Sequence, residues 1–194
     1  SVVCVHCLCS CYCSPLELHS SPSLRFSVLS RGFQNPVFEL EGVNVSSTVC
    51  RRHVAAGEME TASRCLGYPY RMGGRVVAGF QEGRKLGFPT ANIQLADPRR
   101  LVPASGVYAV RVKVGDEATW RLGMMNIGTR PTFGGEKVSL EVHIFDFAGD
   151  LYGQEVEVAF LRRVREERKF ASPEELAAQL ARDKQTILDA CCLS

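Results

Sequence analysis

The feature that most constrains the fold is a series of short segments in which apolar and polar residues alternate. In residues 138–147, for example, Leu140, Val142 and Ile144 occupy every second position. Side chains of a β-strand point alternately to its two faces, so this pattern predicts a strand with one apolar face. Glycine or proline separates the segments, which are residues 75–78, 106–114, 119–127, 138–147 and 154–161. Short strands at this spacing favour a mainly β protein, either a closed antiparallel barrel or a sandwich.

Helices are expected on both sides of this β region. Ser172-Pro173-Glu174-Glu175 is a capping box with proline at the first helical position. Apolar residues follow at helical spacing and should pack a C-terminal helix on the barrel; they are Leu176, Leu180, Ile187 and Leu188. Upstream, residues 45–56 and 58–66 predict two short helices, each followed by a glycine.

Composition narrows the class of protein. The 194 residues are 45% hydrophobic and carry a net charge of +2, which argues against nucleic acid or a membrane surface as a partner. Five of the nine cysteines lie within residues 1–13, and residues 73–190 contain none. We therefore expect a reduced, cytoplasmic, monomeric protein. The chain begins with serine, which suggests a fragment or an imperfect gene model.

The N-terminal tract, residues 1–44, is expected to be disordered or atypical. Its cysteines lie mostly at C-x-C spacing, so a zinc site there remains an alternative to unstructured sequence.

The loop Gly83-Arg84-Lys85-Leu86-Gly87-Phe88-Pro89-Thr90-Ala91-Asn92 is a candidate phosphate and metal site. Glycines let backbone N–H groups approach an anion, and Arg84 and Lys85 add positive charge. Thr90 and Asn92 share a face in an extended chain, so both can offer oxygen to a hard cation such as Mg²⁺. The loop matches neither the P-loop nor the dinucleotide-binding pattern, and a plain surface turn has a similar composition.

Glu141 is the candidate general base. It lies within an apolar strand on the face opposite Leu140 and Val142, where a carboxylate needs a polar cavity or water. The alternative is an ordinary solvent-facing glutamate. His143 shares this face and is either another candidate base or a packed ring.

Two further segments complete the candidate set. Residues 126–135 combine polar, aromatic and glycine residues as lid loops often do. Residues 165–170 carry Arg165, Arg168 and Lys169, and form either a solvated charged face or part of the same site.

Taken in order, these motifs resemble riboflavin kinase over roughly residues 70–190. The resemblance rests on Leu86-Gly-Phe-Pro-Thr-Ala-Asn92, Gly106-Val-Tyr108, Asn126-Ile-Gly-Thr-Arg-Pro-Thr-Phe133, Leu140-Glu-Val-His-Ile-Phe-Asp146 and Arg165-x-Glu-x-Lys-Phe170. It implies a six-stranded antiparallel Greek-key barrel that transfers the γ-phosphoryl group of ATP to the 5′-hydroxyl of riboflavin, producing FMN.

The resemblance also implies roles for individual residues. Glu141 would be the catalytic base, and Thr90 and Asn92 would hold Mg²⁺ with ATP. The remaining implied contacts are with ATP for Gly83, Arg84, Lys85, Gly87 and Pro89, and with flavin for Asn126, Arg130, Thr132, Arg165 and Phe170.

Residues 45–69 look like the end of the adenylyltransferase module of bacterial bifunctional riboflavin kinase/FAD synthetases, which leaves residues 70–194 as the kinase barrel. The His-x-Gly-His signature of that module is absent, so FAD synthesis is not expected. Two other functions remain open: a non-catalytic flavin- or nucleotide-binding remnant, and a metal-binding protein acting through the N-terminal cysteines.

Overall fold

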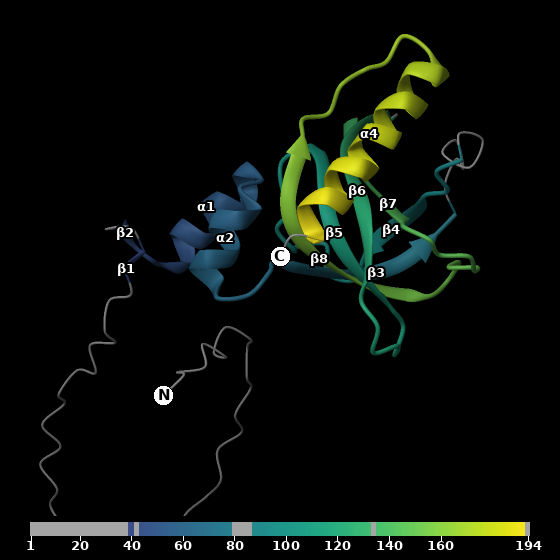
Figure 1. Ribbon diagram of the computed structural model, residues 1–194. Coiled ribbons are helices and arrows are strands. Elements are labelled where there is room, and N and C mark those ends of the chain that lie inside the picture. The colour runs from purple at the N-terminus through teal and green to yellow at the C-terminus, as the bar shows by residue number, and fades with distance from the viewer. Residues whose placement is uncertain (1–38, 41–42, 79–86, 133–134, 193–194) are drawn as a thin grey trace, which may run out of the picture. The chain divides into compact units, whose positions relative to one another are not determined.

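The computed structural model describes residues 39–40, 43–78, 87–132 and 135–192 (Figure 1). Among these residues, six strands form one closed antiparallel barrel in the order β3-β4-β7-β6-β5-β8. The strands are β3 (Arg71–Val77), β4 (Ala91–Leu95), β5 (Gly106–Val114), β6 (Arg121–Thr132), β7 (Gly135–Ile144) and β8 (Glu155–Arg165). β8 returns to pair with β5 after the β5-β6-β7 meander, which is the Greek-key arrangement. The predicted barrel is confirmed.

Three helices accompany the barrel in the described residues: α1 (Ser47–Ala56), α2 (Met59–Leu66) and α4 (Pro173–Cys192). A two-stranded sheet of β1 (Glu39–Leu40) and β2 (Val43–Asn44) precedes α1. One half of the predicted capping box is present, because the Ser172 hydroxyl accepts a hydrogen bond from the Glu175 amide; the Glu175 carboxylate accepts from the amide of Ala171, one residue before the cap. The predicted C-terminal helix is confirmed.

The apolar face of each strand points into the barrel. On β7, Leu140, Val142 and Ile144 are at most 5% exposed, as the alternation predicts. Tyr108 and Phe160 meet edge to face at 5.4 Å in the centre of this core. The Tyr108 hydroxyl donates a hydrogen bond to the carbonyl of Ala104, so its polar end is satisfied.

The helices α1 and α2 contribute to the same core. Val54, Met59 and Ala62 are at most 2% exposed and belong to one cluster with the inward-facing strand residues. Gly57 joins the two helices with φ of +80°, and a Cβ at this position would overlap the Tyr108 hydroxyl. The α1–α2 pair is therefore packed into the core of the barrel. The predicted domain boundary near residue 70 stays a prediction.

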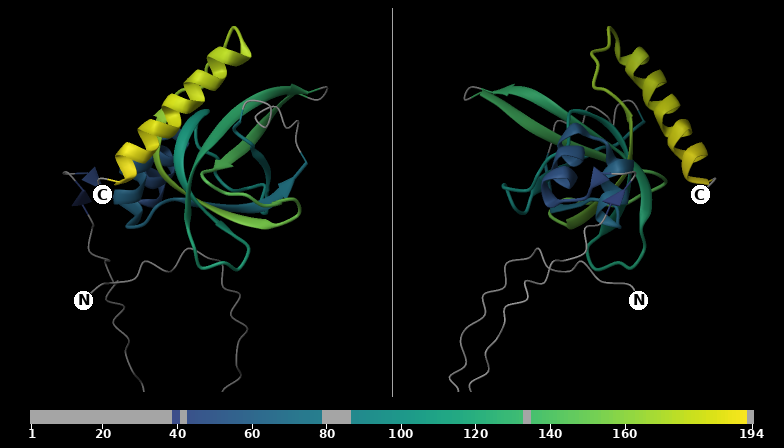
Figure 2. Two further views of the ribbon diagram at one scale, coloured as in Figure 1. Left: turned by 45° about the vertical axis from the view of Figure 1, so that its right-hand side comes forward. Right: turned by 90° about the vertical axis from the view of Figure 1, so that its left-hand side faces the viewer.

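The helix α4 covers part of the outer wall, as both views in Figure 2 show. Its Ile187 is 1% exposed and packs with outward-facing residues of β5, β6 and the end of β7, namely Val107, Ala109, Met124 and Phe145. The barrel wall is thus apolar on both faces beneath α4, and strands buried on both sides lose the simple alternating pattern.

Most strand boundaries differ from the sequence-based expectation: β6 ends at Thr132 rather than at residue 127, β7 starts at Gly135 rather than at residue 138, and β8 ends at Arg165 rather than at residue 161. β7 ends at Ile144 rather than at residue 147, because Asp146 adopts φ of 52° in the following turn. β3 starts at Arg71, four residues before the predicted start. Its Gly74 weakens the strand pattern, yet a Cβ there would overlap the backbone carbonyl of Gln94 on β4, so glycine permits this close pairing.

Candidate functional site

Three polar side chains lie in one row across neighbouring strands. Glu141 on β7 is the register partner of Asn92 on β4 and of Asn126 on β6. Direct partners in an antiparallel ladder have Cβ atoms about 5 Å apart on the same face. The next ladder rung, with Val142 and Met125, points into the core, so this polar row faces outward. All three row residues are half-buried.

Thr90 directly precedes β4 and lies at the edge of a cavity of about 760 Å³. One side of this cavity is formed by Pro89, Thr90 and Ala91, and the other by the turn between β7 and β8, including Phe147 and Tyr152. Inward-facing residues of β3 and β7 also line it, namely Val76, Val142 and Ile144. A largely apolar cavity of this size accommodates a drug-sized or nucleoside-sized ligand. The polar row begins two residues from Thr90, at Asn92.

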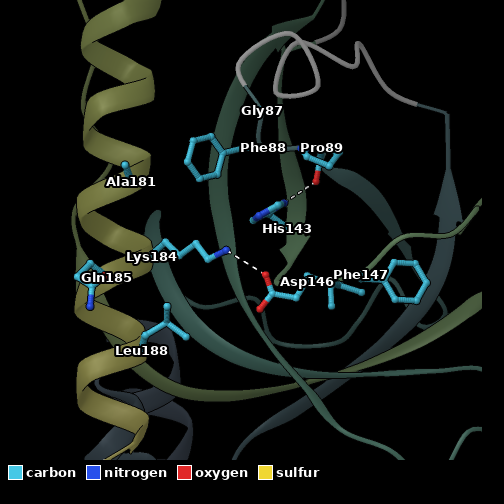
Figure 3. A pocket seen from close by; sticks show the side chains of 11 residues that line it. Gly87, Phe88, Pro89, His143, Asp146, Phe147, Ala181, Lys184, Gln185 and Leu188 are labelled. Carbon is cyan, nitrogen blue, oxygen red and sulfur yellow. Dashed lines mark hydrogen bonds and ion pairs between the residues drawn. The ribbon is translucent and has the colours of Figure 1, made fainter.

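His143 lies beneath the Phe88–Pro89 segment, as Figure 3 shows. Its Nδ1 is 2.8 Å from the carbonyl oxygen of Pro89, and the residue is 7% exposed. The ring contacts Phe88 edge to face at 5.4 Å and Phe145 at 5.6 Å. Burial lowers the pKa of His143, and the Lys184 charge acts in the same direction. The side chain is thus neutral at pH 7, with Nδ1–H donating to Pro89.

A second cavity, of about 460 Å³, separates this histidine from α4. In Figure 3, Lys184 reaches from α4 across the cavity to Asp146, which follows β7. Their Nζ and Oδ1 atoms are 3.3 Å apart. Gln185 and Leu188 also line the helical side.

The segment between β8 and α4 passes over the outer face near the polar row. The Glu167 carboxylate lies against Gly128, where a Cβ would overlap it. Gly128 is two residues from Asn126 on the same strand, so a side chain at position 128 would point to the same outer face as Asn126. This segment is therefore adjacent to the polar row on the outer wall, as expected if residues 165–170 belong to the site.

Arg165 is held by a buried carboxylate. Its Nε and Nη2 both lie 2.9 Å from Oδ2 of Asp183, whose side chain is 3% exposed. Gln179 donates to the other oxygen of Asp183 at 2.7 Å. The Arg165 and Arg168 guanidinium groups lie 5.5 and 4.6 Å from the centre of the Phe170 ring. Arg165 thus links the strand, the helix and Phe170.

The structure brings Asn92, Asn126 and Glu141 together and places Thr90 and Pro89 beside them. Gly87 is exposed, with φ of +80°. Gly83, Arg84 and Lys85 lie outside the described residues, as do the side chains of Arg130 and Thr132, whose backbone belongs to β6. The roles predicted for all of these residues stay predictions.

Sequence reasoning missed Asp183. The signal was present, because residue 183 falls on the apolar stripe of α4 between Leu180 and Ile187. An aspartate at such a position is costly unless a cation pairs with it, and Arg165 supplies that cation.

The donor set suits a magnesium ion that arrives with a nucleotide. Thr90 and Asn92 offer neutral oxygen atoms, and Mg²⁺ in phosphate-transfer sites keeps several waters and takes few protein ligands. Within the described part of the chain, no cluster of three His, Cys, Asp or Glu side chains could hold a resident metal. None of the described helices is long and apolar enough to cross a membrane.

Comparison with known proteins identifies relatives of this region. The family model for riboflavin kinase (flavokinase) matches residues 66–191. The bifunctional riboflavin kinase/FMN adenylyltransferase of Pseudomonas fluorescens is 49% identical over 146 residues, which are 75% of this chain and 46% of that protein. The protein of the same name from Escherichia coli K12 is 46% identical over 146 residues, covering 75% and 45%.

A solved structure has the same fold. The crystal structure of a macrolide-efflux protein from Streptococcus pneumoniae superposes with a TM-score of 0.73 at 40% identity, covering 77% of this chain and 48% of that one. The chain spans less than half the length of the two bifunctional relatives.

Proposed function

We propose, since the chain belongs to the riboflavin kinase family, that it transfers the γ-phosphoryl group of ATP to the 5′-hydroxyl of riboflavin. The observation that carries this proposal is the outward-facing row of Asn92, Glu141 and Asn126, which begins two residues from Thr90, a residue that lines the cavity. A carboxylate placed between two carboxamides on a rigid wall can orient a hydroxyl nucleophile, and the adjacent cavity can hold the nucleotide.

The geometry suggests how the two substrates share the site. The nucleoside of ATP occupies the cavity between Thr90 and the β7–β8 turn, and its phosphates extend past Thr90 toward Asn92. The terminal phosphate then reaches the polar row, which contains Glu141. Thr90 and Asn92 would hold the magnesium ion that accompanies ATP, and the ion would offset the negative charge of the phosphates.

Riboflavin approaches the row from the side of the β8–α4 segment. Asn126 and Phe170 contact the flavin, and Arg165 orients Phe170 from behind while it remains paired with Asp183. The proposal keeps the predicted flavin contacts of Arg130 and Thr132 and the predicted phosphate contacts of Gly83, Arg84, Lys85 and Gly87.

In the reaction, the riboflavin 5′-oxygen forms a bond to the γ-phosphorus as the bond to the β-γ bridging oxygen breaks. Glu141 accepts the hydroxyl proton, and ADP leaves with the bridging oxygen. Phosphoryl transfer of this kind depends mainly on positioning and on charge stabilisation. The main contribution of the protein is therefore the fixed placement of these side chains on the barrel wall.

The decisive experiment is incubation of the full chain with riboflavin, ATP and Mg²⁺, with separation of FMN by chromatography. FMN formation that requires ATP is expected. If riboflavin and ATP bind but no FMN forms, the chain is a non-catalytic binding remnant instead. A chain lacking residues 1–34 should form FMN at the same rate, since the N-terminal cysteines have no part in this chemistry.

The proposal is confined to phosphoryl transfer. The two relatives carry FMN adenylyltransferase in their names, and more than half of each lies outside the matched region. Production of FAD from FMN and ATP in the same assay would extend the proposal, and we do not expect it.

A further inference from the structure

The ladder between β4 and β7 stops where the candidate metal site begins. Its register pairs are Asn92 with Glu141 and Ala91 with Val142. The residue before Thr90 is Pro89, which has no backbone N–H and cannot continue an antiparallel ladder. Its carbonyl oxygen can still accept a hydrogen bond.

His143 supplies that donor. Its Nδ1 lies 2.8 Å from the Pro89 oxygen, which can only accept, so Nδ1 carries the hydrogen. A side chain thus donates to the carbonyl oxygen of Pro89 beyond the last register pair of β4 and β7. The Phe88 and Phe145 rings contact the imidazole at 5.4 and 5.6 Å and fix its orientation.

This contact joins the two functional elements of the site through one strand. His143 and Glu141 are two residues apart on β7 and point to the same face. Pro89 is covalently bonded to Thr90, and Asn92 is the register partner of Glu141. Any movement of the Pro89–Thr90 peptide away from β7 would therefore move the threonine hydroxyl relative to the carboxylate.

We infer that His143 is a positioning residue that holds Pro89 and Thr90 against β7, so that the Mg-ATP ligands stay in register with Glu141. This inference rests on the proposed function and adds a residue to it. It also agrees with the interpretation of His143 as a packed ring, because the residue is 7% exposed and its ring contacts Phe88 and Phe145.

The test compares two substitutions of similar size. In His143→Asn, the amide nitrogen occupies about the position of Nδ1 and can still donate to Pro89. In His143→Leu, the volume is similar but no donor remains. His53→Leu on α1 is the matched control, because His53 also uses Nδ1, at 2.5 Å from Oε2 of Glu58, but lies on a different element from the site.

We expect His143→Leu to raise the KM for Mg-ATP about tenfold, the effect of losing one part-buried hydrogen bond from the bound state, while the KM for riboflavin changes little. His143→Asn should restore most of the loss, and His53→Leu should match the unmodified protein. If His143→Leu does not fold, His143→Gln replaces it, since its amide lies one carbon further out and cannot take the place of Nδ1.

A second measurement does not depend on activity. Amide hydrogen exchange of the peptide spanning residues 87–95 should be faster in His143→Leu than in His143→Asn, while exchange in β5 stays the same. Equal exchange and equal KM values in the Asn and Leu variants would overturn the inference. If the unmodified chain makes no FMN, the proposed function fails, and the exchange comparison still decides the role of His143.

Discussion

The Arg165–Asp183 ion pair permits a quantitative prediction. Asp183→Leu removes a carboxylate whose side chain is 3% exposed and leaves Arg165, 18% exposed, without its partner. Removing one member of a buried ion pair typically costs about 3–5 kcal/mol. Because Arg165 retains some access to water, we expect the lower end of this range, about 3 kcal/mol. For a domain of this size, that loss lowers Tm by roughly 6–12 °C.

The double variant distinguishes a buried charge from lost packing. Arg165→Leu combined with Asp183→Leu removes both charges, and apolar replacements of buried ion pairs are often close to neutral in stability. The double variant should therefore be more stable than Asp183→Leu alone. Asp189→Asn is the control: Asp189 is exposed on the same helix, accepts a hydrogen bond from Gln185, and should change stability by less than about 0.5 kcal/mol.

Thermal and urea unfolding, followed by circular dichroism, measure these differences. The reasoning is refuted if the unfolding free energy of Asp183→Leu lies within about 1 kcal/mol of that of the unmodified chain. It is also refuted if the destabilisations of the single variants Asp183→Leu and Arg165→Leu simply add in the double variant.

Four other predictions concern the site and the core. Glu141→Gln should lower kcat by about 10²–10⁴ with little change in Mg-ATP binding, and full turnover in steady-state kinetics would remove Glu141 from the mechanism. Thr90→Ala and Asn92→Ala should each weaken Mg-dependent nucleotide binding in calorimetry about tenfold, so unchanged affinity in both would exclude the metal assignment. Burial and Lys184, partly offset by Asp146 and by the hydrogen bond to Pro89, lower the pKa of His143 from its ordinary value of about 6.5, so the unfolded chain binds the proton more readily. The stability contribution is therefore complete above about pH 6.5 and is lost as the pH falls below it, and the slope of unfolding free energy between pH 7.5 and 5.5 should be smaller in His143→Asn. Met59→Ala should destabilise the chain by about 2–5 kcal/mol in urea unfolding, since Met59 is 0% exposed within the barrel core, and a loss below 1 kcal/mol would mean that α2 is not part of that core.

Alternation predicted five of the six barrel strands. It located β5 at its observed bounds and the apolar positions of β7 correctly, because inward residues of these strands repeat with period two. It did not reveal β4, which has only five residues and follows a proline. The pairing of β4 with β7 depends on contacts about fifty residues apart, and no local pattern encodes them.

The sequence predicted which residues form the candidate site but not how they are arranged in space. Glu141 and Asn92 were candidates for separate reasons, and only the strand register shows that they are direct neighbours. Glu141 was predicted to lie on the face of its strand opposite the apolar residues, and its position agrees with this. The part played by His143 could not be foreseen, since it depends on a carbonyl group 54 residues away in the chain.

The packing of α1 and α2 bears on how this barrel domain can be moved between proteins. Val54, Met59 and Ala62 fill the same core as the strands, although the family match begins at residue 66. An excised or fused barrel that started at the match would expose the apolar side chains that these three residues cover. A transplantable unit should instead start before Ser46, whose hydroxyl caps the first turn of α1.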